Sequence, residues 1–185
     1  WLLPALGPES AAAARESADQ AVLTVVVDDN YPPYVFRDSH GTPKGYLVDW
    51  WALWSRRTGV AVDLQASDWA LALRRIEDGE AQVIDTVFET AERQRFLDFS
   101  PPYADIPVSI FAHTSIGGLS DIDTLRGFVV GAKTGDACVE RLRSSGVTDL
   151  ALHDSYQQLV NAAIAGKIKV FCLDEPPAQF LLYRA

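Results

Sequence analysis

The chain has 185 residues, of which 48% are hydrophobic and 22% charged, so it can bury a core and is not a disordered chain. Its formal net charge of −9 at pH 7 argues against a surface that neutralises nucleic-acid phosphates. The two cysteines, Cys138 and Cys172, form no CxxC pair, and the three histidines lack the spacing of a zinc site. We therefore expect no metal, no other cofactor and no nucleic-acid partner.

The composition of residues 1–21 predicts a leader, that is, a signal remnant or a membrane-proximal segment. They begin with a short apolar run and contain four consecutive alanines at positions 11–14, as in the tail of a secretory signal or a segment just outside a membrane helix. The run is too short to span a bilayer by itself. An Ala-rich helical leader is the alternative, and export is the reading that we favour.

Strands and helices alternate through the first half of the remaining chain. The β-branched run at residues 22–27 is typical of a strand that is covered on both faces. A turn with two prolines follows it, and residues 35–36 resume a strand. Helices are predicted at residues 47–58 and 69–78, strands at 60–64 and 81–87, and a short helical turn at 91–95.

The second half repeats this alternation after a strand at residues 107–112 that leads away from the first unit. Strands are predicted at residues 128–132, 150–152 and 169–173. One helix is opened by residues 133–136 and runs to about residue 144, and two more are predicted at residues 156–165 and 175–183. A βαβα pattern that occurs twice predicts an α/β protein with parallel sheets and helices on both faces. We expect lobe one at residues 22–108 and lobe two at residues 109–185.

Polar and aromatic residues gather where the predicted strands end, which is where open α/β sheets bind ligands. A guanidinium such as that of Arg93 suits an α-carboxylate, and a carboxylate such as that of Asp174 suits an α-ammonium. Tyr31, Tyr34 and Trp69 offer aromatic faces. This set of groups suits a free amino acid, and no nucleophile or acid–base pair with catalytic spacing is found.

Several motifs occur in an order and spacing that resembles a known family. They are NYPPY at residues 30–34, GTPKGYLVD at 41–49, TAER at 90–93, FSPPY at 99–103, GAKTG at 131–135 and the stretch 166–174. The sequence resembles the periplasmic solute-binding proteins of family 3, which bind polar amino acids and have the two-lobed, type II Venus-flytrap fold. It is most similar to modules fused to bacterial cyclic-di-GMP or histidine-kinase signalling proteins.

The resemblance implies a role for several residues. Arg93 matches the arginine that clamps the ligand carboxylate, and Asp174 matches the aspartate that holds the ammonium. Thr86 and Phe88 match a strand end whose backbone meets the ligand, although Phe88 replaces a residue that is often serine. At the start of the lobe-two helix, where a serine or threonine often helps to bind the carboxylate, Thr134 and Asp136 are expected to line the site. Asp136 would repel a carboxylate and suits a helix cap.

The resemblance also points to the ligand side chain. Asp28 matches an acidic residue of members that bind basic amino acids, and Tyr31 and Trp69 match aromatic residues that enclose a planar cation. Aromatic faces and a carboxylate suit a guanidinium, so arginine is the predicted ligand, with lysine or ornithine weaker.

The implied biology is an extracytoplasmic sensor that relays lobe closure to a signalling protein in the inner membrane, with a homodimer as one arrangement. Three alternatives stay open: a transport-type binding protein, a small cyclic-acid dehydratase using Asp136, and a dimerisation module. Family members return to lobe one at their C-terminus, and this chain is expected to lack that return. A disulfide between Cys138 and Cys172 is compatible with an oxidising compartment.

Overall fold

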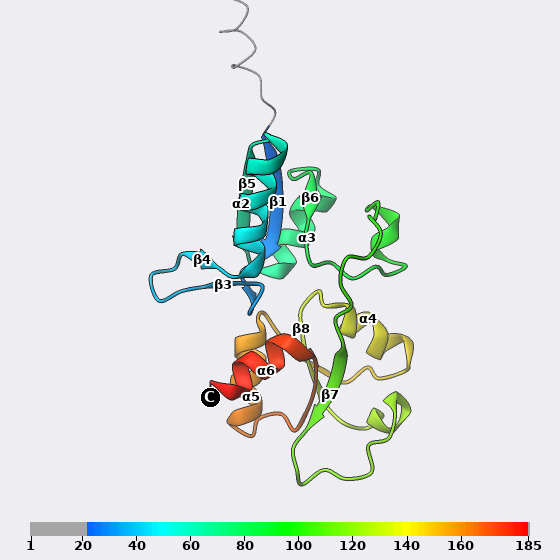
Figure 1. Cartoon of the computed structure of the whole chain (residues 1–185). Coiled ribbons are helices and arrows are strands. Elements are labelled where there is room, and N and C mark those ends of the chain that lie inside the picture. Colours follow the sequence, from blue (N-terminus) through cyan, green and yellow to red (C-terminus); the bar gives the residue numbers. More distant parts are fainter. Residues whose placement is uncertain (1–21, 185) are drawn as a thin grey trace, which may run out of the picture.

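The computed structural model describes residues 22–184, which form two α/β lobes stacked end to end (Figure 1). The predicted leader at residues 1–21 lies outside the described residues. Within residues 22–184, none of the helices combines the length and the apolar character that a bilayer-spanning helix needs.

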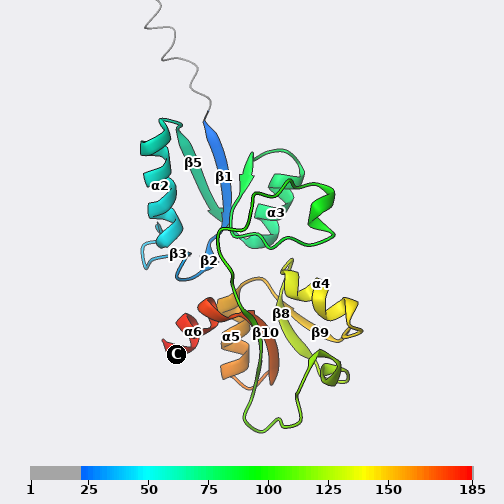
Figure 2. The same ribbon diagram turned by 45° about the vertical axis from the view of Figure 1, so that its right-hand side comes forward.

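Lobe one is built on a parallel sheet with the strand order β5-β1-β6. Its strands are β1 (Leu23–Asp28), β5 (Val62–Ser67) and β6 (Val83–Ile84). Helices α2 (Tyr46–Thr58) and α3 (Trp69–Glu77) lie on opposite sides of this sheet (Figure 2). The prediction that the first strand is covered on both faces is therefore confirmed.

The alternation of side chains along β1 explains this two-sided cover. Val25 and Val27 pack with Leu47 and Trp51 of α2, whereas Val26 packs with Trp69 and other residues of α3. All three valines are fully buried. A continuous run of β-branched residues can satisfy both faces, whereas an alternating apolar–polar strand would leave one face polar.

Strand β6 is shorter than the sequence predicts, and its end has a chemical reason. The Asp85 carboxylate accepts the backbone N–H of Thr86 at 2.7 Å, and Thr86 adopts a left-handed backbone with φ of 59°. A β-branched residue in this conformation breaks the pleat and is strained. The chain then runs through η1 (Arg93–Arg95) toward lobe two.

Lobe two has a four-stranded sheet with the order β7-β10-β8-β9. The strands are β7 (Val108–Ala112), β8 (Val130–Lys133), β9 (Leu150–His153) and β10 (Val170–Asp174). Strands β8, β9 and β10 are parallel as predicted, but β7 pairs with β10 in the antiparallel sense. The expectation of an all-parallel sheet was wrong here. A parallel pair of strands needs a crossover connection, usually a helix, and only the short turn η2 (Ile122–Leu125) lies between β7 and β8.

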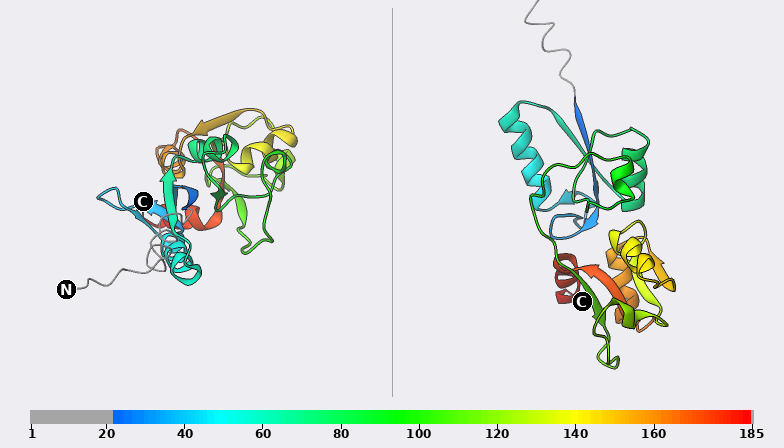
Figure 3. Two further views of the ribbon diagram at one scale, coloured as in Figure 1. Left: turned by 90° about the horizontal axis from the view of Figure 1, so that it is seen from above. Right: turned by 90° about the vertical axis from the view of Figure 1, so that its right-hand side faces the viewer.

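The lobe-two helices are α4 (Ala137–Ser144), α5 (Tyr156–Ile164) and α6 (Glu175–Tyr183), with a 3-10 turn η2 (Ile122–Leu125) before β8. The segment before β7 links the two lobes along one side (Figure 3). We propose to divide the described chain at β7, close to the boundary expected from the sequence.

Two features outside the main sheets complete the fold. A small antiparallel sheet of β2 (Asn30–Tyr31), β3 (Val35–Arg37) and β4 (Pro43–Lys44) lies at the end of lobe one that faces lobe two, and the sequence indicated only its middle strand. In lobe two, a disulfide joins Cys138 at the start of α4 to Cys172 on β10. Both sulfur-bearing residues belong to the buried core of that lobe.

Candidate functional site

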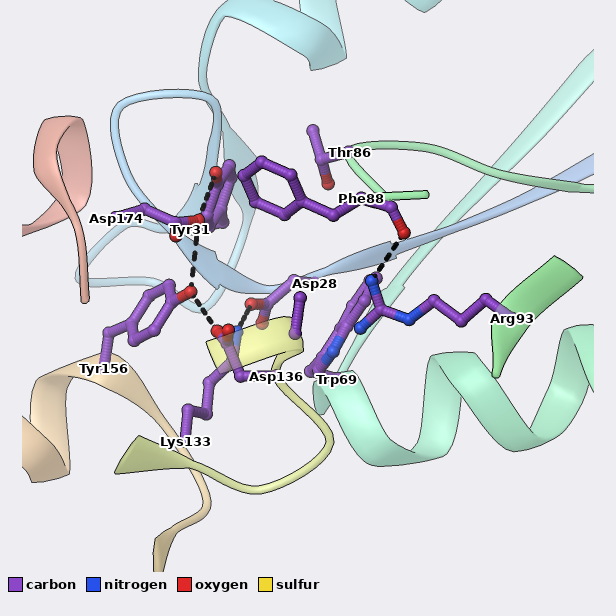
Figure 4. A pocket seen from close by; sticks show the side chains of 11 residues that line it. Asp28, Tyr31, Trp69, Thr86, Phe88, Arg93, Lys133, Asp136, Tyr156 and Asp174 are labelled. Atoms are coloured by element: carbon purple, nitrogen blue, oxygen red, sulfur yellow. Dashed lines mark hydrogen bonds and ion pairs between the residues drawn. The ribbon is translucent and has the colours of Figure 1, made fainter. Parts of the chain in front are cut away.

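A pocket lies between the two lobes, and its walls come from the strand and helix ends that face each other (Figure 4). Lobe one contributes residues at the carboxyl ends of its strands and at the start of α3, and lobe two contributes the corresponding residues of its own sheet. The lining residues are Asp28, Tyr31, Trp69, Thr86, Phe88, Arg93, Lys133, Asp136, Ala137, Tyr156 and Asp174.

All the site residues predicted from the sequence line this pocket except Thr134. Its backbone N–H bonds instead to the carbonyl of His153, at 2.8 Å, on the neighbouring strand. Lys133 and Tyr156 line the pocket and were missed. Each occupies a position that the general rule for open sheets identifies, since Lys133 ends β8 and Tyr156 begins the helix after β9.

Asp174 is the end residue of β10 and is almost completely buried. Its Oδ2 accepts the hydroxyl of Tyr31 at 2.7 Å and lies 3.2 Å from the hydroxyl oxygen of Tyr156, whose proton it shares with Asp136. Its Oδ1 has no hydrogen-bond partner among residues 22–184. Burial, followed by the nearby charge of Asp136, raises the pKa of Asp174 to about 7, against lowering by the two tyrosine hydrogen bonds and by Lys133. A cationic group beside Oδ1 would favour the ionised form.

Arg93 is buried in the turn η1, and its guanidinium bridges the lobes. It donates to the carbonyl of Phe88 in lobe one and to the carbonyl of Gly135 in lobe two, both at 2.9 Å. It also lies 5.5 Å from the centre of the Trp69 ring. Burial lowers the pKa of Arg93 from its ordinary value, and nearby acidic groups oppose that effect. A guanidinium has five N–H donors, so two carbonyl bonds leave donors for a carboxylate.

Asp136 has the capping position that its residue type suggested. Its Oδ1 accepts the backbone N–H of Cys138 at 2.8 Å at the start of α4. Its Oδ2 accepts the hydroxyl of Tyr156. Both oxygens of Asp136 therefore have partners within lobe two. Burial, followed by the charges of Asp136 and Asp174, raises the pKa of Tyr156, so its hydroxyl stays protonated and remains a donor.

Lys133 changes the environment that the sequence predicted for Asp28. Its Nζ forms an ion pair with Oδ2 of Asp28, and both side chains are almost fully buried. The same ammonium lies 3.9 Å from the centre of the Tyr156 ring. The reading of Asp28 as a free distal charge is thus corrected, because a lysine of the chain already neutralises it. We call the space around Asp28, Tyr31, Trp69 and Tyr156 the Asp28 subsite.

Further contacts join the lobes around the pocket. The Trp69 Nε1–H donates to the Gly135 carbonyl at 3.0 Å, so this carbonyl accepts donors from two lobe-one residues, Trp69 and Arg93. At the rim, the Asn30 side-chain oxygen accepts the backbone N–H of Gln157 at 2.9 Å. Together with the Tyr31–Asp174 hydrogen bond, these contacts define an arrangement in which the lobes touch.

Comparison with known proteins places this geometry in a family. Residues 23–167 match the family model of bacterial extracellular solute-binding proteins, family 3. The chain belongs to this family. It is also 26% identical over 160 residues to the L-cystine-binding protein TcyJ of Escherichia coli K12, an alignment that covers 84% of this chain and 60% of TcyJ. The chain thus spans less than two thirds of the length of this relative.

Solved structures show the same two-lobed fold. A histidine kinase sensor domain with similarity to periplasmic binding proteins aligns with a TM-score of 0.82 at 24% identity, over 88% of this chain and 72% of that one. An ancestral arginine-binding protein bound to arginine aligns with a TM-score of 0.77 at 21% identity, over 88% and 74% of the two chains. The predicted type II periplasmic-binding-protein fold is confirmed.

Proposed function

We propose that this chain is an extracytoplasmic module that binds a free L-amino acid between its two lobes. The observation that best supports the proposal is that Asp174, a buried carboxylate in the pocket wall, has no partner for its Oδ1 within the described part of the chain. A buried polar atom without a partner costs free energy, and an α-ammonium would supply the missing hydrogen bond. The family membership supports a small solute as ligand.

Arg93 would bind the other end of the ligand. In the present arrangement its guanidinium donates to the backbone carbonyls of Phe88 and Gly135. A ligand carboxylate would add charge-assisted bonds, which are stronger than those to neutral carbonyls. Arg93 and Asp174 approach the pocket from lobe one and lobe two respectively, so a ligand that binds both would stabilise the closed arrangement of the lobes.

The sequence predicts arginine as the preferred amino acid. Solved neighbours include an ancestral arginine-binding protein bound to arginine and an ancestral arginine-binding protein bound to glutamine, and the relative TcyJ is named for L-cystine. These names support an amino acid as the ligand class without choosing its side chain. Arginine would have to displace Lys133 from Asp28 to reach the carboxylate that the sequence assigned to it.

For the biological role, we propose sensing, with lobe closure relayed to a signalling domain of a membrane-anchored parent protein, where a homodimer could transmit the change. Similarity to a histidine kinase sensor domain supports this role, and similarity to TcyJ keeps a transport-type binding protein as the alternative. The disulfide between Cys138 and Cys172 supports an oxidising, extracytoplasmic location.

A thermal-shift screen of the chain against the twenty amino acids tests the central claim. A ligand at 100 times its dissociation constant adds about 2.7 kcal/mol to the stability of a protein that binds it in the native state. We expect at least one L-amino acid to raise the melting temperature and its D-enantiomer to have little effect. No stabilisation by any of the twenty would refute amino-acid binding and favour the dimerisation-module alternative.

A further inference from the structure

Lys133 has a complete binding environment inside the pocket. Its ammonium is paired with the Asp28 carboxylate and lies 3.9 Å from the Tyr156 ring centre, 5.4 Å from that of Trp69 and 5.8 Å from that of Tyr31. The lysine is only 2% exposed. A carboxylate surrounded by aromatic faces is also the environment that a binding protein would offer to the side chain of a basic ligand.

We propose that Lys133 is a specificity-determining residue that occupies the Asp28 subsite as a covalently attached cation and excludes basic amino acids from it. The site would then take L-amino acids with uncharged side chains. This inference rests on the proposed amino-acid binding and concerns only which side chain is accepted. It reverses the arginine preference that the sequence predicts from Asp28, Tyr31 and Trp69.

The electrostatic reason is that one carboxylate cannot satisfy two buried cations. If a guanidinium entered beside Lys133, two like charges would share Asp28 in a space of low dielectric constant. If it replaced Lys133, the lysine would lose its paired carboxylate, and an unpaired buried ammonium is strongly destabilising. An uncharged side chain imposes neither cost and leaves the Lys133–Asp28 pair intact.

The other charged groups of the pocket do not offer a second place for a basic side chain. The Asp136 oxygens already accept the Cys138 N–H and the Tyr156 hydroxyl. The open Oδ1 of Asp174 is assigned to the ligand ammonium, and Arg93 would repel a second guanidinium. Among the residues that line this pocket, Asp28 is therefore the acceptor on which a basic side chain would depend, and Lys133 already holds it.

The wild-type chain gives a first test that needs no substitution. Arginine and citrulline have nearly the same shape, but citrulline has an uncharged ureido group in place of the guanidinium. In calorimetric titrations with each, we expect citrulline to bind at least as tightly as arginine. A tenfold or greater preference of the wild-type chain for arginine would overturn the inference while leaving amino-acid binding established.

Removing the internal cation gives the second test. In Lys133→Ala, Asp28 loses its partner and space opens beside it, so we expect arginine affinity to rise at least tenfold relative to the tightest uncharged amino acid of the wild-type screen. Lys169→Ala is the matched control, because it removes one positive charge from an exposed residue of the same lobe. It should leave the ratio unchanged.

The double variant Lys133→Ala, Asp28→Asn identifies the cause of the gain. It has the same added space without the carboxylate, so the arginine gain should disappear. An arginine gain that persists would mean that Lys133 acts only by filling space, which overturns the charge argument. An unchanged arginine ratio in a folded Lys133→Ala chain would also overturn it. If that variant does not fold, as circular dichroism would reveal, the arginine–citrulline ratio of the wild type decides.

Discussion

The hydroxyl of Tyr31, on β2 of lobe one, donates to Oδ2 of Asp174, at the end of β10 in lobe two, over 2.7 Å. Burial, followed by the charge of Asp174, raises the pKa of Tyr31 far above its ordinary value, so this hydroxyl remains a donor at physiological pH. The bond therefore fixes one oxygen of Asp174 across the lobe boundary and leaves the other for a ligand.

Truncation of Arg93 tests the carboxylate anchor. We expect Arg93→Ala to weaken amino-acid binding by at least about thirtyfold, because loss of a charged partner at a buried site typically costs on the order of 2–5 kcal/mol. Arg95→Ala is the matched control, since Arg95 lies in the same turn but is exposed. Isothermal calorimetry measures both, and equal affinities of the two variants would remove Arg93 from the site.

Ligand affinity should depend on pH through Asp174. Its pKa is raised to about 7, so below that pH the carboxyl is protonated in the free protein and must lose its proton to bind an ammonium. We expect affinity to fall by up to about tenfold for each pH unit below 7 and to level off above it. Calorimetry between pH 5 and pH 8 measures the slope, and Asp174→Asn should bind weakly with no such slope.

The stability of the ligand-free protein should show the opposite trend. A carboxyl group with a pKa raised from 3.8 to about 7 binds more protons when folded than when unfolded between those values. Its contribution to the free energy of unfolding therefore decreases as the pH rises from about 4 to 7. Urea unfolding at several pH values, compared with Asp174→Asn, would isolate this term, and identical pH profiles for both chains would contradict it.

Gly135 should control how closely the lobes approach. It has a left-handed backbone with φ of 74°, and a Cβ there would lie 3.1 Å from Leu73 Cδ1 of lobe one. We expect Gly135→Ala to add backbone strain of about 1–2 kcal/mol and, by shifting the Gly135 carbonyl, to weaken its hydrogen bonds with Trp69 and Arg93 across the lobes. Gly166→Ala is the control, because Gly166 has a similar φ of 68° and open space around it.

Small-angle scattering and calorimetry can distinguish these two glycine variants. Both should lose stability, but only Gly135→Ala should increase the radius of gyration and weaken ligand binding. A saturating amino acid should shift the wild type toward the compact form, with bending in the segment at residues 103–111 that was predicted as the hinge. Equal scattering of both variants would show that Gly135 has no part in lobe approach.

The disulfide should stabilise lobe two and its part of the site. Cys138 and Cys172 are 34 residues apart, and closing a loop of that size contributes roughly 3–4 kcal/mol by restricting the unfolded chain. We expect a chain with both cysteines changed to alanine to melt at a lower temperature and to bind more weakly. Titration of the denatured wild type without reductant should find no free thiol, and two free thiols would contradict the bridge.

The sequence predicted the elements well because most of them follow from local patterns. The run at residues 22–27 and Gly59 at the end of α2 both act through their immediate neighbours. The antiparallel sense of β7 was not predictable in this way. It depends on how the chain crosses between lobes, which no local periodicity records.

The site was predicted less completely, because Lys133 and Tyr156 were missed, and Lys133 changes the site most. A lysine that follows a buried strand is more often a solvated strand end, and its pairing with Asp28 spans 105 residues and two lobes. The family resemblance supplied Asp28, Tyr31 and Trp69 as partners for a ligand, but it could not indicate that another residue of the same chain would meet them. Only the three-dimensional arrangement reveals that competition.

The carbonyl of Gly135 would compete with a ligand carboxylate for the guanidinium of Arg93. It accepts one bond from Arg93 and another from Trp69, so the lobes already gain free energy from contact before any carboxylate arrives. A ligand that draws Arg93 toward itself weakens the contact that it is expected to reinforce. The change in closure is then set by the difference between the two sets of bonds. In the sensor proposed above, this contact would raise the signal of the ligand-free state and narrow the difference between the ligand-free and ligand-bound signals, and substitutions that weaken the carbonyl contact would widen that difference.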